Sequence, residues 1–544
     1  MINAEQKKSV GFILLLASII FVVAFGVYLL TLSGDFSNDS DYLFYGRVVE
    51  GGDTPGVREF FHLLWIPLGK AVYGLLQHLG MTVRGIWIME GISAFFGALS
   101  LSFFFLLLVF LVGETAVPFI TALLMGFSVN YWFMCVTDKL YPISGLLLVC
   151  FFLLLKASRG DARWSLALGA AHGLALLGHA TNILFALPVL AGLLAVRRPL
   201  REKILNLLAY AFSLVLLLII LGPLLAQNQG LSPWELVRNA AGIMNMARFN
   251  AQITGAASGF TRYVFQVVAC EEFFQMWLPL LLPALLLIFW KKMKPHAQAV
   301  LLCLVWGVFS FFLYLWENAN LYVVLFPFWI LVGVLLSVVS RSFFRGEAAK
   351  IFRWGLMALL VLAGMVIFCL NMVDSFLPLH QGRTDPCIGA VQLYSRDLAP
   401  GNVVLTTGFF ALYFSYFAKC EVLDIYNEAN FYKGQKVADC VSSQVRSFME
   451  QGHKVFLHDN PANFRPVCYY LSDEAKIEVT ESECANLRGK PGGRLICFGL
   501  KDCLELKKGI TKNFELVRIK KYSDQDALFL LQQPAGTHGI EERF

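Results

Sequence analysis

Charged residues are scarce in this chain of 544 residues. Asp, Glu, Lys and Arg make up 15% of it and hydrophobic residues 57%, whereas a soluble globular domain has about 25% charged residues. This composition excludes an ordinary soluble enzyme and indicates a membrane protein. The 48 Phe, 18 Tyr and 11 Trp exclude a disordered chain. The net charge of +6 is small and lies in short loops between apolar runs, so we expect no nucleic-acid partner.

Several motifs are also missing. The 12 cysteines include no C-x-x-C pair, so neither a zinc site nor a thioredoxin-like motif is indicated. No G-x-G-x-x-G follows a predicted strand, which leaves a dinucleotide-binding role without support. Residues 1–10 lack the cleavage-site pattern of a secretory signal, so we read the first apolar run as a retained membrane span.

Long apolar runs fill the first 373 residues and then stop. A helix needs roughly 20 apolar residues to cross the hydrocarbon core, and eleven runs qualify or nearly do. They are 11–32, 86–112, 115–136, 140–156, 164–178, 181–196, 204–226, 276–290, 298–316, 320–340 and 354–373. The sequence therefore predicts a membrane α-helical bundle of about 11 transmembrane helices, although the fifth, sixth and eighth runs are short.

The basic residues predict the orientation of this bundle, because short cytoplasmic loops carry an excess of Lys and Arg. With the N-terminus inside, the cytoplasmic loops hold sixteen basic and five acidic residues, and the loops on the opposite side hold eight basic and eleven acidic ones. The long loops 33–85 and 227–275, and everything after residue 373, are then extracytoplasmic. We expect a multi-pass protein with a cytoplasmic N-terminus.

Residues 374–544 have the composition of a folded domain, separate from the transmembrane domain at 1–373. Strand-like segments occur at 402–407, 420–425, 454–458, 494–499, 515–521 and 527–532, and helical segments at 409–418 and 437–451. Such alternation predicts a small α/β domain in which at least the first strands are parallel. The simplest interpretation is an outer platform that packs on the loops and shapes a substrate groove.

Seven cysteines fall in this C-terminal part: Cys387, Cys420, Cys440, Cys468, Cys484, Cys497 and Cys503. An oxidising outer compartment would allow up to three disulfides. Their connectivity cannot be derived from the sequence, and the number is odd.

Acidic residues open the first outer loop, where Asp35, Asp39 and Asp41 follow the first span. Carboxylates at this depth are costly unless they have a function, although a solvated polar cap at a membrane exit is the alternative. Farther along the same loop, residues 59–79 form an amphipathic stretch that carries His62, either a surface helix or one wall of a site.

Other predicted outer turns carry further polar residues. Asp138, Lys139 and Tyr141 lie in the shortest of these connections, so that the carboxylate faces the same outer cavity as Asp35. His179 interrupts an apolar run, where it either serves a site or caps a helix. Glu317 lies in another turn, and the 227–275 loop contributes Arg262, whose planar fork suits a phosphate.

These residue types fit one chemistry. A carboxylate can act as general base on an acceptor hydroxyl or hold a divalent cation, and Arg or Lys can neutralise a departing phosphate. Tryptophans can stack against a sugar. The residues indicate group transfer from a lipid-phosphate carrier at the membrane surface.

At this point the sequence resembles the GT-C superfamily of integral-membrane glycosyltransferases, in its protein O-mannosyltransferase-like and bacterial branches. The resemblance covers about the first 200 residues: Gly34-Asp35 with Asp39 and Asp41 after the first span, Asp138 in the next short outer loop, and the run from Gly173 to His179 and Thr181. Asp138-Lys139 stands where glutamate-valine is usual, and Gly-His replaces Asn-His. The late His-Pro-Pro-Gly is absent, with His62 or Thr54-Pro55-Gly56 in its place.

The resemblance implies an inverting hexosyl- or pentosyltransferase that uses a polyprenyl- or dolichyl-phosphate sugar and a lipid, glycan or protein acceptor on the outer face. It assigns Asp35 as the leading base and Asp138 as a second carboxylate. Asp39, Asp41, His62, Lys139, Tyr141, His179, Glu317 and Arg262 are the substrate-binding candidates. Metal dependence varies across the superfamily, so a Mg²⁺ or Mn²⁺ ion at Asp35 and Asp138 stays open.

Three alternatives remain. A polymerase or ligase of lipid-linked glycans needs the same outer residues. A transporter or flippase would show internal repeats, and the sequence has no such repeat. A structural assembly subunit would not need the acidic loop residues. Compact loops and the absence of a C-terminal retrieval signal favour a bacterial inner membrane.

Overall fold

The computed structural model describes most of the chain. The described residues are 4–34, 41–52, 63–137, 145–195, 198–227, 289, 291–316, 321–342, 347–381, 387–406, 408–424, 437–460, 467–472, 476–479, 493–498, 500–523 and 526–533. They form two compact units, one of Met1–Ser33 with Tyr45–His380 and the other of Gly34–Phe44 with Gln381–Phe544.

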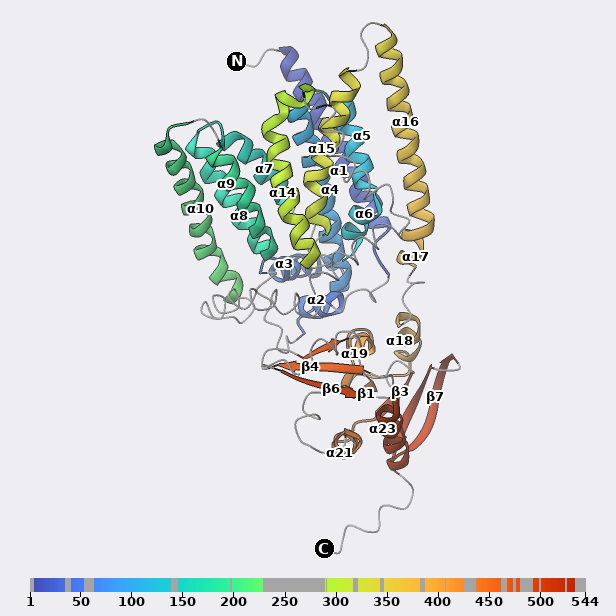
Figure 1. The fold of residues 1–544 in the computed structure, drawn as a ribbon. Helices are drawn as coiled ribbons and strands as arrows, with labels where there is room; N and C mark the ends of the chain where they lie inside the picture. The colour runs from blue at the N-terminus through green and yellow to red at the C-terminus, as the bar shows by residue number, and fades with distance from the viewer. Residues whose placement is uncertain are drawn as a thin grey trace, which may run out of the picture. The chain divides into compact units, whose positions relative to one another are not determined.

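The first unit is a bundle of apolar helices (Figure 1). Its long helices are α1 (Ala4–Leu30), α4 (Gly85–Val112), α5 (Ala116–Gly126), α6 (Val129–Val136), α7 (Leu146–Ala157), α8 (Ala162–Gly178), α9 (Ala186–Leu194), α10 (Leu200–Gln227), α14 (Ala297–Trp316), α15 (Leu321–Ser342) and α16 (Glu347–Asn371). Each predicted span coincides with one or two of these helices, except 276–290, which lies almost wholly outside the described residues. The apolar runs therefore do form helices.

Fewer helices meet a strict length criterion for crossing a membrane. Within the part of the chain that the structure describes, Val10–Leu30, Gly85–Val112 and Leu200–Leu225 are long and apolar enough. The helices α5 and α6 make a fourth candidate as a pair, although they are bent by 63° at their junction. The total of about eleven spans stays a prediction.

Short elements connect the long helices. They are α2 (Asp41–Val49), α3 (Trp65–His78), the 3-10 helices η3 (Ala180–Phe185) and η4 (Lys294–His296), the π-helical turn η6 (Met372–Phe376) and α17 (Leu377–His380). The helix α3 falls in the predicted amphipathic stretch and runs across the axes of the long helices (Figure 1).

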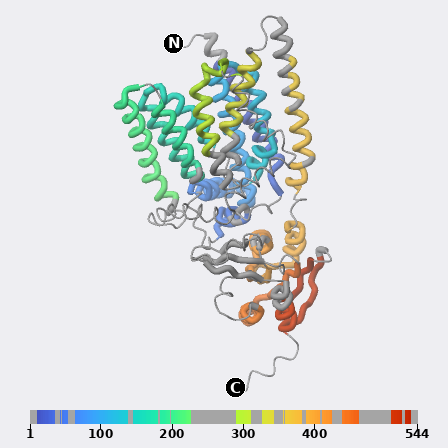
Figure 2. Tube along the Cα trace, viewed as in Figure 1, coloured from blue at the N-terminus to red at the C-terminus, as the bar shows by residue number. Residues whose placement is uncertain are grey.

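The helices α8 and α10 run side by side (Figures 1 and 2) and approach closely at glycines. A Cβ atom on Gly169 would lie 2.2 Å from the carbonyl oxygen of Tyr210, and one on Gly173 would lie 2.9 Å from a methyl carbon of Leu217. Small residues at helix contacts allow such backbone approach in membrane proteins. Gly169 therefore sets the distance between these helices.

The second unit contains a five-stranded sheet in the order β2-β1-β3-β8-β7. Its strands are β1 (Val403–Thr406), β2 (Glu421–Asp424), β3 (Val455–Asp459), β7 (Glu515–Ser523) and β8 (Asp526–Gln532). The first strand is parallel to β2 and β3, whereas β8 is antiparallel to β3 and β7. The predicted parallel pairing of the first strands is confirmed.

Helices cover this sheet. The helices α21 (Val437–Glu450) and α23 (Leu500–Asn513) pack on one face, where Val441 and Ile510 join Leu405 and Leu457 in an apolar core. The other helices of the unit are α18 (Ile388–Tyr394) and α19 (Gly408–Tyr413), which continues as the π-helical turn η7 (Phe414–Ala418).

A second sheet has three antiparallel strands in the order β5-β4-β6. They are β4 (Val467–Ser472), β5 (Lys476–Val479) and β6 (Gly493–Phe498). The sequence patterns predicted β6, but not β4, β5, α18 or α23.

The close packing of α8 on α10 is testable at Gly169. We expect Gly169→Ala to destabilise the protein by about 1–3 kcal/mol, because the added methyl group forces the two backbones apart. The control is Gly91→Ala in α4, where nothing lies within 4 Å of the added carbon. That change should be neutral or stabilising by up to about 1 kcal/mol, since alanine favours a helix. Thermal unfolding in detergent measures both, and equal melting temperatures would contradict the packing argument.

Candidate functional site

The ends of α1 and α6 are joined by one backbone hydrogen bond. The amide nitrogen of Ser33 donates to the carbonyl oxygen of Val136 at 2.9 Å, and both residues are fully buried. Asp35 and Asp138, the two predicted catalytic carboxylates, each follow one of these residues by two positions. Both aspartates lie outside the described residues, so a shared site for their carboxylates stays a prediction.

Trp132 makes this junction rigid. Its indole Nε1 donates to the hydroxyl of Thr31 at 2.9 Å, and that hydroxyl donates to the carbonyl oxygen of Val27 at 2.8 Å. The buried indole stacks between Phe368 and Phe376, with ring centroids 5.4 and 4.1 Å away. Stacked aromatic pairs contribute about 0.5–1.5 kcal/mol beyond their buried area, so the end of α6 is held firmly.

The bend between α5 and α6 brings α6 to this position. Gly126 ends α5, and a Cβ atom there would lie 2.4 Å from a methyl carbon of Leu101 in α4. The carbonyl oxygen of Gly126 accepts a hydrogen bond from the Tyr28 hydroxyl at 2.8 Å. A helix end in an apolar bundle needs such partners for its backbone groups. The bend is therefore stabilised by α1 itself.

A second backbone hydrogen bond joins the first long loop to the end of α8. The amide nitrogen of Leu64 donates to the carbonyl oxygen of Leu177 at 3.0 Å. His62, which precedes Leu64 by two positions, lies outside the described residues. His179 follows Leu177 by two positions, so this bond brings together the segments that carry the two predicted histidines.

His179 terminates α8 and is buried, with 5% of its surface exposed. Its amide nitrogen donates to the carbonyl oxygen of Ala175, and the amide nitrogen of Asn182 donates to the carbonyl oxygen of His179. Burial lowers the pKa of the His179 imidazole to about 4, so it is neutral at pH 7. The residue therefore ends α8 with a buried, uncharged imidazole.

Glu50 anchors the first long loop to the start of α4. One of its carboxylate oxygens accepts from the amide nitrogen of Gly85 at 2.8 Å and lies 3.3 Å from Nε of Arg84. A negative charge is favourable at a helix N-terminus, where unpaired amide groups point outward. This contact holds the C-terminal end of α2, the helix that Asp41 begins.

Glu90 lies five residues farther along α4 and is completely buried. An ionisable side chain inside a membrane bundle is costly and marks a functional position by default. The sequence analysis had assigned it no role. The sequence feature that could have identified Glu90 is that it is the one carboxylate within the apolar run 86–112.

Most of the predicted site residues lie outside the described part of the chain. They are Asp35, Asp39, His62, Asp138, Lys139, Tyr141, Arg262 and Glu317. Their roles stay predictions. Among the described residues, no three His, Cys, Asp or Glu side chains come close enough to hold a metal ion.

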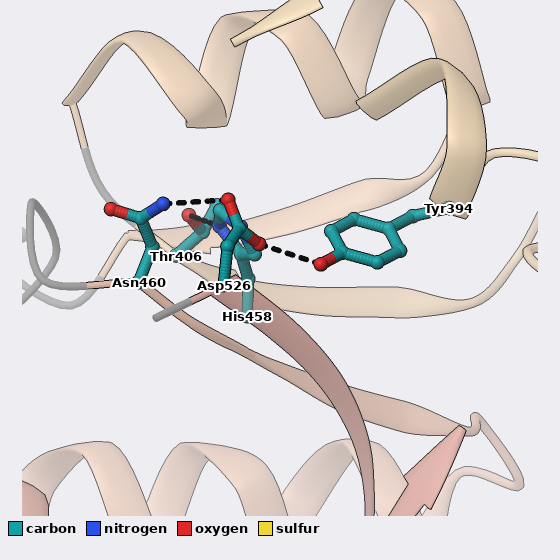
Figure 3. A network of polar contacts seen from close by, with 5 residues as sticks. All are labelled: Tyr394, Thr406, His458, Asn460 and Asp526. Carbon is teal, nitrogen blue, oxygen red and sulfur yellow. Dashed lines mark hydrogen bonds and ion pairs between the residues drawn. The ribbon is translucent and has the colours of Figure 1, made fainter. Parts of the chain in front are cut away.

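A different polar cluster lies at the carboxyl ends of β1 and β3, in the second unit (Figure 3). The carboxylate of Asp526 accepts from the Tyr394 hydroxyl at 2.6 Å, from His458 Nε2 at 3.0 Å and from Asn460 Nδ2 at 2.7 Å. The other ring nitrogen of His458 lies 3.2 Å from the Thr406 hydroxyl. No sequence motif indicated this cluster.

The order of groups in this cluster, hydroxyl to imidazole to carboxylate, is that of a nucleophilic triad. Thr406 and His458 are both completely buried, however, so a substrate cannot reach the hydroxyl. Burial raises the pKa of the Asp526 carboxyl, but the hydrogen bonds and charge of His458 and the bonds from Tyr394 and Asn460 outweigh it and hold this pKa below its usual range. The cluster therefore stabilises the sheet.

The fold of the chain matches known structures over nearly its whole length. Two crystal structures of ArnT from Cupriavidus metallidurans, one bound to undecaprenyl phosphate and one in the apo state, are similar with TM-scores of 0.53 and 0.54. Each alignment covers 96% of this chain and 98% of ArnT, at 14% sequence identity. No protein-family model and no curated protein matches the sequence. The chain therefore has the overall fold of these ArnT structures.

The indole–hydroxyl bond at the junction of α1 and α6 can be measured with a double-mutant cycle. Trp132→Phe removes the donor but keeps an aromatic ring, and Thr31→Val removes the acceptor. If the bond stabilises the junction, the double variant will lose less free energy of unfolding than the sum of the single variants, by about 0.5–1.5 kcal/mol. Strictly additive losses in detergent unfolding experiments would show that the bond contributes nothing.

The Asp526 cluster predicts a stability that depends on pH. A carboxyl whose pKa is lower in the folded state stabilises the fold above its unfolded pKa of about 3.9, and this contribution is lost as the pH falls through the folded value. Asp526→Asn should therefore lower the thermal midpoint at pH 6, because buried donors left unpaired cost about 1–3 kcal/mol each. The difference from the wild type should shrink below about pH 4.

The matched control for this measurement is Asp397→Asn. Asp397 pairs with Lys520 at 2.7 Å, and about a third of each side chain is exposed. Exposed ion pairs contribute little to stability, so this variant should melt close to the wild type at both pH values. Equal shifts for the two variants, or a difference that does not change with pH, would contradict the role of Asp526.

Proposed function

We propose that the chain is a glycosyltransferase that moves a sugar from a polyprenyl-phosphate carrier to an acceptor hydroxyl on the outer face of a membrane. The observation that carries this proposal is the hydrogen bond between Ser33 and Val136. In a chain with the GT-C fold, this hydrogen bond holds together the starts of the two loops that bear Asp35 and Asp138. The crystal structure of ArnT with undecaprenyl phosphate supports a carrier of this chemical class.

In the proposed reaction, Asp35 removes the proton of the acceptor hydroxyl. The acceptor oxygen forms a bond to the anomeric carbon of the sugar, while the bond from that carbon to the phosphate oxygen breaks and the configuration inverts. The phosphate leaves on the polyprenyl chain as an anion, which Arg262 and Lys139 neutralise. Asp138 orients the acceptor or holds a divalent cation beside the phosphate.

The neutral imidazole of His179 suits a binding role. An uncharged ring can donate one hydrogen bond to a phosphate or sugar oxygen without the cost of burying a charge. Asp39, Asp41, His62, Tyr141 and Glu317 complete the proposed binding residues, on loops that would face the outer side. The same topology gives a cytoplasmic N-terminus and an extracytoplasmic C-terminal region, in a bacterial inner membrane.

Loss of either carboxylate tests this proposal. Purified protein is incubated with undecaprenyl-phosphate sugars, and the release of undecaprenyl phosphate is followed with a membrane lipid extract as acceptor and with water alone. We expect Asp35→Asn to lower the rate by about 10²–10⁴, the usual contribution of a general base. Asp138→Asn should lower it as well. Adding a chelator to the wild type shows whether the rate of release depends on a divalent cation.

The control is Asp161→Asn. Asp161 caps α8 through a hydrogen bond from the amide nitrogen of Arg163, on the predicted cytoplasmic side, and asparagine caps a helix equally well. This variant should keep full activity. Wild-type rates in both Asp35→Asn and Asp138→Asn would disprove the catalytic assignment. Activity only with an oligosaccharide-linked donor would instead identify a glycan polymerase or ligase, and no release from any donor would favour a transporter.

A further inference from the structure

Two cysteines are direct partners in the backbone register of the strands β4 and β6. The register pairs six consecutive residues of each strand, from Val467 with Phe498 to Ser472 with Gly493, and in it Cys468 is the direct partner of Cys497. The pairing has no irregularity over this length, so the two cysteines occupy one rung of a continuous antiparallel ladder.

The Cα spacing that this register implies is compatible with a disulfide. Directly opposed residues of an antiparallel pair share one face of the sheet, and their Cα atoms lie about 4.5 or 5.5 Å apart. Disulfides join cysteines whose Cα atoms are about 4.4–6.8 Å apart. A slip of one residue would put the two cysteines on opposite faces, so the match depends on the register that the structure shows.

Three other cysteines of the second unit are not disulfide-bonded. Cys387, Cys420 and Cys440 are buried thiols in the structure. Burial raises the pKa of the Cys420 thiol to about 11, which keeps it protonated and unreactive at neutral pH. The register of β4 and β6 instead favours a disulfide between Cys468 and Cys497.

We propose that Cys468 and Cys497 form a disulfide that links the central strand β4 to the edge strand β6. The bond forms by exchange with the disulfide of an oxidising protein or of oxidised glutathione. The two cysteines lose two protons and two electrons as their sulfur atoms join, and the donor disulfide takes up both and becomes two thiols. The reaction requires an oxidising compartment, which agrees with the predicted outer position of residues 374–544.

The disulfide has a structural role in a small sheet. Three strands are near the minimum that is stable without other support, and among the described strands β6 pairs on one side only. A covalent bond across the ladder fixes its register and removes chain entropy from the unfolded state. The disulfide would hold the strands of this sheet in one register, whether or not a substrate is bound at the proposed site.

The experiment uses the full-length protein and needs no activity. Intact cells are treated with an alkylating reagent before lysis, so that no thiol oxidises later, and the purified protein is digested without reductant. Mass spectrometry should find the peptide containing Cys468 joined to the peptide containing Cys497. After reduction, both cysteines should take up a second, differently labelled reagent.

Single substitutions serve as controls. In Cys468→Ser, the first reagent should label Cys497 under denaturing conditions, and in Cys497→Ser it should label Cys468. The matched variant Cys420→Ser should leave the linked peptides unchanged and expose no new thiol. Complete labelling of Cys468 and Cys497 in the unreduced wild type, or a link from either one to Cys484 or Cys503, would overturn the proposal. Neither outcome would bear on the proposed transferase activity.

Discussion

One backbone hydrogen bond, from Ser33 to Val136, brings together the ends of α1 and α6. The residues that it joins are 103 positions apart and end two different helices. Without the bend of 63° between α5 and α6, the chain would leave the bundle at another point and the two acidic loops would start apart. The bend, the indole of Trp132 and the hydroxyl of Tyr28 therefore all hold the end of α6 beside the end of α1.

Several polar side chains described inside the bundle have a hydrogen-bond partner on a neighbouring element. The hydroxyl of Tyr131 donates to the carbonyl oxygen of Gly97, and that of Ser102 donates to the carbonyl oxygen of Ala17. His172 donates from Nε2 to the carbonyl oxygen of Asn182, which leaves Nδ1 to accept from the Tyr210 hydroxyl at 2.6 Å. An apolar side chain in a membrane gains little by exchanging lipid for protein contacts. Hydrogen bonds of this kind therefore help to join the helices. They explain how an apolar sequence selects one arrangement of its helices.

The sequence predicted the elements that local physics controls and missed those that depend on distant partners. Apolar runs gave the helices because a hydrocarbon core requires them, and alternation gave β1, β2 and β3. The break of the run 181–196 into η3 and α9 was not predicted, because it depends on bonds from His179 and Asn182 to the end of α8. The Asp526 cluster could not be predicted either, since Tyr394 and Asp526 are 132 positions apart. For the candidate site, the pattern of apolar runs and acidic residues identified the loops. Only the fold shows that the starts of two of these loops, at Ser33 and Val136, lie together.

The central hydrogen bond joins two backbone groups, the amide of Ser33 and the carbonyl of Val136. A bond between a backbone amide and a backbone carbonyl does not depend on the side chains of the two residues, so most substitutions at positions 33 and 136 leave donor and acceptor in place. The side chains that must be retained are those that aim the two chain ends, such as the indole that holds α6. The junction of α1 and α6 therefore depends on a few buried aromatic and small residues, such as Trp132 and Gly126, more than on the side chains of Ser33 and Val136.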